Sequence, residues 1–259
     1  MQALVLVGGL GLRLRPAVSD RPKCMALVAG RPFLEYVLRA LCRQGVSDFV
    51  LATGYLAASV QSHFGRGERL GIRIEYSEES EPLGTAGAIR LAAQEMKDAS
   101  WLVANGDSLL DFDLAQLEKT HVTHNALATL ALVKKAQTDR YGCAELDAQG
   151  RVSVFHEKPT GGQSGLINGG VYLLDRRVLD YIPMKSKVSF ETETLPQLLA
   201  AGVYGVPSTG YFIDIGLPED LAHAQADPSE LLRLAGLSGN PAGVRNPESG
   251  MCSGGIVRG

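Results

Sequence analysis

The sequence predicts an α/β fold in which a doubly wound, mixed but mostly parallel sheet carries helices on both faces. Short apolar runs alternate with amphipathic stretches through the first half of the chain, which is the pattern of a parallel sheet covered on both sides. The first apolar run ends at two glycines, Gly8 and Gly9. The chain of 259 residues, 45% hydrophobic and 20% charged, has the size and composition to bury a large core.

The first half supplies the parallel part of this sheet. Its clearest helix follows the first strand, because Phe33, Val37, Leu38 and Leu41 recur at helical spacing. Ligands bind at the carboxyl ends of the strands in such sheets, so we expect chemistry in the loops after strands 3–7 and 101–104. The expected order is strand 3–7, helix 33–44, strand 49–53, helix 57–64, strand 72–76, helix 85–96 and strand 101–104.

The second half changes character and is expected to add mixed sheet to the first half. It is predicted to contain strands 126–133, 142–146, 152–157 and 168–174, a helix at 189–201, a strand at 211–215 and a helix at 218–226. Pro218 stands at the start of that last helix, where helix geometry favours proline. We therefore expect one domain over residues 1–228 and a tail over residues 229–259, which is partly helical, then rich in glycine and loosely ordered.

Charge and composition argue against several classes of partner. The net charge is -3 and no long basic run is present, which disfavours a nucleic-acid partner. No apolar run approaches the roughly 18 residues of a membrane span, and the N-terminus lacks the features of a secretion signal. The sequence leaves the oligomeric state open, a homo-oligomer included. Free thiols in a cytoplasmic protein are the simplest interpretation of four scattered cysteines: Cys24, Cys42, Cys143 and Cys252.

A glycine-rich loop follows the first strand. Glycines such as Gly8, Gly9 and Gly11 let backbone N–H groups approach a phosphate without interference from a Cβ atom. Arg13 adds a planar fork of donors and Lys23 a compact charge, a combination that suits a triphosphate and the charge on a departing pyrophosphate. A tight turn carrying solvated cations is the alternative, because the loop has neither Walker A nor dinucleotide spacing.

An ordered set of motifs resembles the sugar-phosphate nucleotidyltransferase family over about residues 1–226. Within that family the likeness is greatest to D-glycero-D-manno-heptose 1-phosphate guanylyltransferases. Two departures stand out: Leu12 where the family usually has Thr, and Cys24 where it often has Pro. The motifs are the GGxGxRLxP…PK loop from Gly8, EPLGTAGA from Glu81, NGD from Asn105, EKP from Glu157, NGGVY from Asn168 and YFIDIG from Tyr211.

The resemblance implies a Rossmann-like fold of the nucleotide-diphospho-sugar transferase type and a magnesium-dependent reaction. A nucleoside monophosphate would pass from a triphosphate to a sugar 1-phosphate, with release of pyrophosphate. Arg13, Lys23 and Lys158 are implied as catalytic residues, and Asp107 and Asp214 as Mg²⁺ ligands. Two carboxylates with phosphate oxygens and water suit this ion. The alternatives are a turn or helix-capping role for Asp107 and an ion pair for Asp214.

The resemblance also divides the binding residues between two substrates. The sugar phosphate is assigned Tyr141, Gly142, Glu157, Lys158, Asn168 and Gly169. The nucleotide is assigned Gly8, Gly9, Gly11, Glu79, Gly84 and Thr85. Plain turns, a packed tyrosine and an exposed Glu–Lys pair are the alternatives for the sugar set.

Glu79 indicates which base is bound. It lies five residues before Gly84, where the family places the side chain that contacts the base edge. A carboxylate only accepts hydrogen bonds. Guanine offers adjacent N1–H and N2–H₂ donors, whereas uracil and thymine offer one donor between two carbonyls. The sequence therefore favours GTP, with a solvated position among neighbouring glutamates as the alternative for Glu79.

Three further functions stay open at this point. One is mannose-1-phosphate guanylyltransferase activity, and another is a uridylyl or thymidylyl relative. The third is a catalytically idle regulatory subunit on the same fold, for which Leu12 and Cys24 are the supporting features. A dehydrogenase is disfavoured because the glycine loop has the wrong spacing for a dinucleotide.

Overall fold

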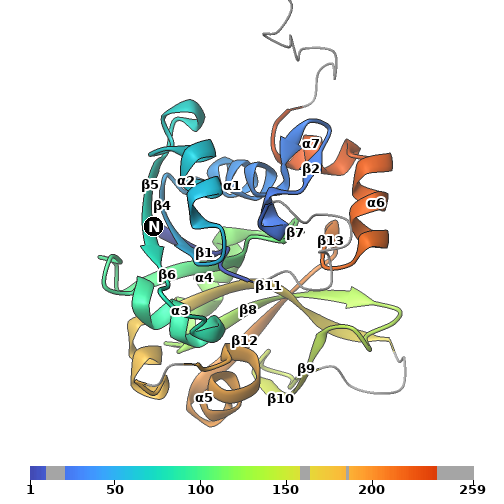
Figure 1. Cartoon of the computed structure of the whole chain (residues 1–259). Helices are drawn as coiled ribbons and strands as arrows, with labels where there is room; N and C mark the ends of the chain where they lie inside the picture. Colours follow the sequence, from blue (N-terminus) through green and yellow to red (C-terminus); the bar gives the residue numbers. More distant parts are fainter. Residues whose placement is uncertain (10–20, 158–163, 185–186, 238–259) are drawn as a thin grey trace, which may run out of the picture.

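A central sheet runs through the molecule between two layers of helices (Figure 1). The structure is a computed structural model that describes residues 1–9, 21–157, 164–184 and 187–237. The strands of the sheet are β1 (Gln2–Leu6), β4 (Asp48–Thr53), β5 (Arg73–Glu78), β6 (Ser100–Asn105), β8 (Ala128–Lys135), β9 (Gly142–Leu146), β10 (Val152–Glu157), β11 (Gly165–Asp175) and β12 (Val203–Ser208).

The strand order explains why ligand-binding loops meet at one edge. The main path is β10-β9-β11-β6-β1-β4-β5, and β8 lies between β11 and β12. The pairings make β10 and β11 run opposite to the other strands of this sheet, so the sheet is mixed and mostly parallel as predicted. The order reverses at β1, because β4 lies on one side and β6 on the other. Such a switch point opens a crevice beyond the carboxyl ends of the strands.

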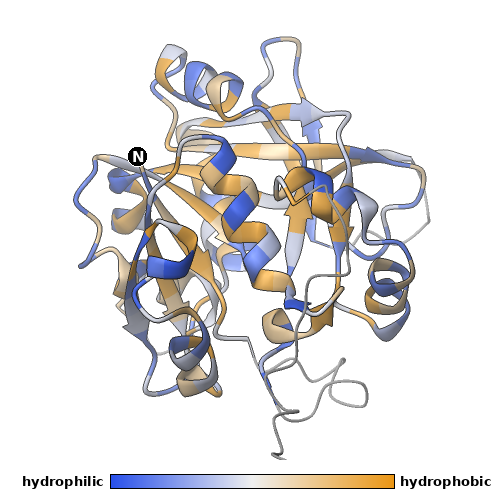
Figure 2. Ribbon diagram, turned by 90° about the horizontal axis from the view of Figure 1, so that it is seen from above, coloured by the Kyte–Doolittle hydropathy of each residue, from blue (hydrophilic) through white to orange (hydrophobic). Residues whose placement is uncertain are grey.

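Helices cover both faces of the sheet and bury separate cores. Alternation along β1 shows this division, since Ala3 and Val5 face one core and Leu4 faces the other. In Figure 2 the strands are largely hydrophobic, whereas the helices mix hydrophobic and hydrophilic residues. The first face carries α1 (Phe33–Arg43), α2 (Ala57–Phe64), α4 (Leu114–Thr123), α6 (Pro218–Ala226) and α7 (Ser229–Leu234), and the second carries α3 (Gly84–Ala92) and α5 (Leu195–Gly202).

Short elements shape the edge beyond the strands. Two small antiparallel sheets are present in the described chain, one of β2 (Leu27–Val28) with β3 (Arg31–Pro32) and one of β7 (Ser108–Leu110) with β13 (Phe212–Asp214). Short 3₁₀-helices occupy Lys23–Met25, Glu68–Leu70 and Arg176–Tyr181, and a π-helical turn at Phe190–Thr194 precedes α5.

All the expected strands and helices are present. Four of them, α2, α6, β9 and β10, have the predicted bounds, and the others have shifted ends. The structure also adds elements that we did not predict. They include the 3₁₀ segments, the strands β2, β3, β7 and β12, and helix α4. The predicted helix at 189–201 begins as the π-helical turn, and the predicted strand at 211–215 pairs with β7 outside the central sheet. Within the tail, α7 is helical and packs against α1 through the buried Leu231 and Leu234. The division at residue 228 stays a prediction, and residues 238–259 lie outside the described residues.

Two backbone features position residues at the switch point. The Gly106 N–H donates to the Leu6 carbonyl (2.9 Å), which ties the turn after β6 to the end of β1. Strand β11 contains a bulge, because its register with β8 shifts between Asn168 and Val171. The bulge places Gly170 at a φ of 72°, in the left-handed region that glycine adopts without strain.

No helix in the part of the chain that the structure describes has the length and apolar character needed to cross a bilayer.

Candidate active site

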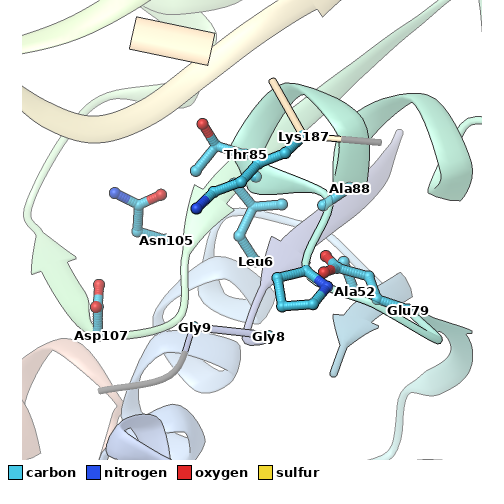
Figure 3. Close-up of a pocket in the computed structure, with 12 residues that line it drawn as sticks. Leu6, Gly8, Gly9, Ala52, Glu79, Thr85, Ala88, Asn105, Asp107 and Lys187 are labelled. Carbon is cyan, nitrogen blue, oxygen red and sulfur yellow. The ribbon is translucent and has the colours of Figure 1, made fainter. Parts of the chain in front are cut away.

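Two adjoining cavities open at the carboxyl ends of the strands. The larger, of about 360 Å³, lies beyond β1, β4 and β6 (Figure 3). The smaller, of about 130 Å³, lies between the end of β6, the bulge of β11 and β13. Asn105 and Asp107 line both cavities. A group bound in one cavity therefore lies next to a group bound in the other.

The larger cavity combines apolar walls with a few polar groups. Leu6, Ala52, Pro82 and Ala88 provide an apolar surface that suits the faces of a flat ring. Gly8 and Gly9 follow β1 after one intervening residue, and glycines at such a place let backbone N–H groups approach an anion. The polar and glycine lining consists of Gly8, Gly9, Glu79, Gly84, Thr85, Asn105, Asp107 and Lys187.

Glu79 sits in this cavity with its carboxylate held in place. Its Oε2 accepts a hydrogen bond from the Leu83 N–H (3.1 Å), and its backbone N–H donates to the Thr53 carbonyl (2.8 Å). Burial raises the pKa of Glu79, and the Leu83 N–H opposes that rise. A carboxylate has about four acceptor positions, so Oε1 can still accept hydrogen bonds from a ligand.

Gly84 and Thr85 join this cavity to a distant segment of the chain. Gly84 has a φ of 71°, and a Cβ atom there would lie 2.4 Å from the Val188 carbonyl oxygen. The Thr85 hydroxyl donates to Glu191 (2.7 Å) and accepts from the Phe190 N–H (2.7 Å). Both residues therefore dock the segment around Val188 onto α3, and the protein itself uses the Thr85 hydroxyl.

Asp107, Lys23 and Asp214 form a cluster where the two cavities meet. The Lys23 ammonium lies 2.7 Å from Asp107 Oδ2 and 3.4 Å from Asp214 Oδ1. The Gly216 N–H also donates to Asp214 Oδ1 (2.7 Å). The Ile215 N–H donates to the Asp107 carbonyl (3.0 Å). These bonds bring residues distant in sequence to one place.

Charges in this cluster depend on one another. Burial alone lowers the pKa of Lys23, but Asp107 and Asp214 outweigh it and hold the pKa above the ordinary value. Burial and the Asp107 carboxylate raise the pKa of Asp214, and Lys23 opposes that rise. A second cation beside the two carboxylates would stabilise their ionised forms.

The smaller cavity is lined mainly by polar groups. Tyr141 forms an edge-on contact with Phe212, and Arg140 packs over the Tyr141 ring while it pairs with Asp220 of α6. The lining residues are Asn105, Asp107, Ser108, Arg140, Tyr141, Gly142, Glu157, Asn168, Gly169, Gly170, Tyr172, Glu191, Phe212 and Asp214. Several donors and acceptors thus converge on a space suited to a hydroxylated ligand.

A chain of hydrogen bonds connects the walls of the two cavities. The Asn168 amide donates to the Tyr172 hydroxyl (2.6 Å), which donates to Glu191 Oε1 (3.2 Å). The other oxygen of Glu191 accepts from Thr85 (2.7 Å). Because burial and the nearby Glu191 carboxylate hold the pKa of Tyr172 well above its ordinary value, this hydroxyl stays protonated and can donate.

The structure groups the predicted binding residues as two sets. Gly8, Gly9, Glu79, Gly84 and Thr85 line the larger cavity. Tyr141, Gly142, Glu157, Asn168 and Gly169 line the smaller one. Lys23 lies between its two aspartates and lines neither cavity. Gly11, Arg13 and Lys158 lie outside the described residues, as does the departure at Leu12.

Sequence reasoning missed several polar residues that the cavities contain, among them Lys187 and Glu191. Lys187 extends into the larger cavity (Figure 3), although no recognisable motif surrounds it. Glu191 lines the smaller cavity and links it to Thr85. The sequence placed Glu191 only within the predicted helix at 189–201. Asn105 was singled out only as part of a motif and without a role.

Comparison with known proteins shows the family to which the chain belongs. A family model described as "Nucleotidyl transferase" matches residues 2–230. The chain belongs to the nucleotidyl transferase family. The curated relatives of this nucleotidyl transferase include a D-glycero-alpha-D-manno-heptose 1-phosphate guanylyltransferase from Aneurinibacillus thermoaerophilus, 40% identical over 88% of this chain and 98% of the relative. A mannose-1-phosphate guanylyltransferase from Mycobacterium tuberculosis is 40% identical over 90% of this chain and 67% of the relative.

Solved structures agree on the fold of this nucleotidyl transferase. HddC from Yersinia pseudotuberculosis, complexed with GMP-PN, matches with a TM-score of 0.76 and 30% identity over 87% of this chain and 98% of HddC. A putative glucose-1-phosphate thymidylyltransferase from Bacillus anthracis has a TM-score of 0.79 at 23% identity over 87% of this chain and 94% of that chain, which supports the Rossmann-like fold alone.

The donor set of this nucleotidyl transferase fits a divalent metal that is shared with a substrate. The described residues contain no cluster of three or more His, Cys, Asp or Glu side chains placed to hold a metal. Mg²⁺ does not need such a cluster, because one or two carboxylates with phosphate oxygens and water suffice. Asp107 and Asp214 meet that requirement, since both lie within 3.4 Å of the same ammonium group.

Proposed function

We propose that this nucleotidyl transferase moves GMP from GTP to D-glycero-D-manno-heptose 1-phosphate or a related higher sugar, giving a GDP-sugar and pyrophosphate. The observation that carries the proposal is the junction of the two cavities, where one lining fits a nucleotide and the other a hydroxylated sugar. The named heptose 1-phosphate guanylyltransferases from Aneurinibacillus thermoaerophilus and Campylobacter jejuni, both 40% identical, support the choice of substrates. We place this reaction in the cytoplasm.

The nucleotide occupies the larger cavity in this proposal. The guanine ring packs against the apolar wall, and its N1–H and N2–H₂ groups donate to the Glu79 carboxylate. Gly8 and Gly9, together with Gly11, give backbone N–H groups to the phosphates. Gly84 and Thr85 act through the shape of the cavity, because the protein uses the Thr85 hydroxyl.

The sugar 1-phosphate occupies the smaller cavity. Glu157 accepts hydrogen bonds from sugar hydroxyls, and Asn168 and Gly169 form the wall opposite Tyr141 and Gly142. We assign Lys158 to the phosphate of this substrate. The bulge at Gly169 and Gly170 keeps that wall free of side chains near the junction.

Asp107 and Asp214 would hold Mg²⁺ at the junction. When bound, the ion supplies positive charge that neutralises phosphate oxygens. Lys23 orients both carboxylates, and we assign Arg13 to the β- and γ-phosphates. Lys187 adds a further positive charge inside the nucleotide cavity.

The reaction then requires alignment more than proton transfer. A phosphate oxygen of the sugar 1-phosphate attacks the α-phosphorus of GTP and forms a new P–O bond. The bond from the α-phosphorus to the bridging oxygen breaks, and its electron pair leaves with pyrophosphate. The nucleophile is already anionic, so neither a general base nor a covalent intermediate is needed.

Mannose 1-phosphate is the second candidate acceptor. The Mycobacterium tuberculosis relative, named a mannose-1-phosphate guanylyltransferase, matches a larger share of this chain than the heptose relatives do. Both sugars would use the same cavity, and they differ in the length of the chain beyond the ring.

A pyrophosphate-release screen tests the proposal. GTP, ATP, UTP, CTP and dTTP are each combined with heptose, mannose and glucose 1-phosphates in the presence of Mg²⁺. We expect the fastest release with GTP and a manno-configured sugar 1-phosphate, and none after chelation of the metal. Faster turnover with UTP or dTTP contradicts the base assignment. Absence of turnover with every pair supports an idle regulatory subunit instead.

A further inference from the structure

Asn105 lies at the boundary between the two cavities and has no assigned role so far. It ends β6, two residues before Asp107. Among the described lining residues, Asn105 and Asp107 are the two that border both cavities. In the proposed reaction, the attacked α-phosphorus must lie at this boundary. Asn105 therefore stands beside the reacting atoms.

The Asn105 amide is available to a ligand. Within the described part of the chain its side chain makes no hydrogen bond, and Figure 3 shows it among the residues that line the larger cavity. Gly170 leaves space for it, because a Cβ atom at that position would lie only 2.8 Å from Asn105 Nδ2. The same atom would lie 2.8 Å from Ser108 Oγ. The backbone of the β11 bulge therefore passes close to the amide, and only glycine leaves room for it there.

Of the two described residues that border both cavities, Asn105 is the one with a neutral donor. Asp107 and Asp214 are acceptors when ionised. Lys23 is engaged with both of them at 2.7 and 3.4 Å. Charge on the non-bridging oxygens of the α-phosphate must be held while the new bond forms and the old one breaks. Preorganised N–H donors are effective in that role.

We propose that Asn105 is a catalytic residue whose side-chain N–H donates to a non-bridging oxygen of the α-phosphate during transfer. This inference rests on the proposed function. The donor holds the α-phosphate in line between the attacking sugar-phosphate oxygen and the departing pyrophosphate. It takes no proton and forms no covalent bond.

Substitution of Asn105 tests the proposal. Asn105→Ala removes the donor, and we expect kcat to fall by about 10²-fold while KM for both substrates changes less than about threefold. Asn105→Asp keeps the shape, replaces the donor with an acceptor and should fall at least as far. The matched control is Asn125→Gly, an exposed position with a φ of 48° that is remote from both cavities. Melting temperatures of all variants should stay near that of the wild type.

GTP with sulfur in place of one non-bridging α-phosphate oxygen distinguishes loss of the Asn105 hydrogen bond from general damage to the structure. Each diastereomer replaces one α-oxygen, and sulfur is a poor hydrogen-bond acceptor. We expect one diastereomer to slow the wild type strongly and Asn105→Ala only slightly, because the lost bond is the same in both cases. Equal slowing of both proteins overturns the proposal, as does normal kcat for Asn105→Ala. If the wild type releases no pyrophosphate with any substrate pair, the proposed function has failed instead.

Discussion

The two cavities of the site differ in size and in chemistry. The larger, of about 360 Å³, is walled by apolar side chains and holds few polar groups. The smaller, of about 130 Å³, has donors and acceptors on nearly every side. Apolar walls discriminate weakly between similar ligands, whereas polar walls reject a ligand that leaves their groups unpaired. Specificity for the sugar should therefore depend on many residues of the smaller cavity, whereas specificity for the base should depend mainly on Glu79.

Removal of the Asp107 carboxylate should have the largest effect, because this residue borders both cavities. We expect Asp107→Asn to lower kcat by on the order of 10³-fold or more, since it weakens metal binding and frees Lys23 at the junction. Pyrophosphate release measures the loss, and circular dichroism checks the fold. Asp48→Asn, which alters a surface ion pair with Arg73, is the control and should retain activity. Normal turnover by Asp107→Asn would show that the metal assignment is wrong.

A change in the smaller cavity should affect one substrate alone. Glu157→Ala removes an acceptor for sugar hydroxyls, and we expect KM for the sugar 1-phosphate to rise roughly 10- to 100-fold. KM for GTP should stay within about twofold, because Glu157 does not border the larger cavity. Steady-state kinetics with each substrate varied in turn measures both constants. A parallel rise of both would remove the distinction between the cavities.

Substitution of Glu79 should affect KM for GTP and not KM for the sugar 1-phosphate. It should also change how KM for GTP depends on pH. Glu79→Gln leaves a donor facing the guanine donors, and we expect KM for GTP to rise roughly tenfold or more. Burial raises the pKa of Glu79, so this carboxyl takes up a proton at a higher pH than an exposed glutamate. The wild-type KM for GTP should accordingly rise as the pH falls through that pKa. In Glu79→Gln this rise should be absent, and an unchanged pH profile would exclude Glu79 from base recognition.

The smallest expected effect comes from glycine substitutions, which distinguish a glycine needed for the fold from one that contacts the nucleotide. Gly84→Ala adds a Cβ atom 2.4 Å from the Val188 carbonyl at a φ of 71°. We expect a loss of about 1–3 kcal/mol in the free energy of unfolding, seen as a melting temperature lower by a few degrees. Gly9→Ala meets nothing within 4 Å and should keep its melting temperature while KM for GTP rises. Equal stability of both variants would contradict the structural role given to Gly84.

Local patterns were sufficient to predict most of the fold. Helix α2 has the predicted bounds, Ala57–Phe64, because helical periodicity and strand alternation are properties of neighbouring residues. Strand β12 escaped prediction for a physical reason. It contains Gly205 and Pro207, which weaken any strand pattern, and it forms through parallel pairing with β8 at the edge of the sheet.

The residues of the site also fall into those that a local motif predicts and those that depend on long-range packing. Motif residues such as Glu79, Asn168 and Gly169 were predicted, since each belongs to a short segment with a recognisable pattern. Lys187 and Glu191 were not, because their places depend on how the segment around Val188 docks on Gly84 and Thr85. Packing of this kind joins residues about 100 positions apart and leaves no periodic trace in the sequence.

The most direct test of the account follows the configuration at the α-phosphorus. The adjoining cavities imply that the sugar phosphate attacks GTP directly, without an enzyme-bound nucleotidyl intermediate. With a single diastereomer of α-thio GTP as the donor, one direct displacement inverts the configuration at phosphorus. We predict inversion in the GDP-sugar product, measured by ³¹P NMR. Retention would mean two successive displacements and would contradict direct transfer between the two cavities.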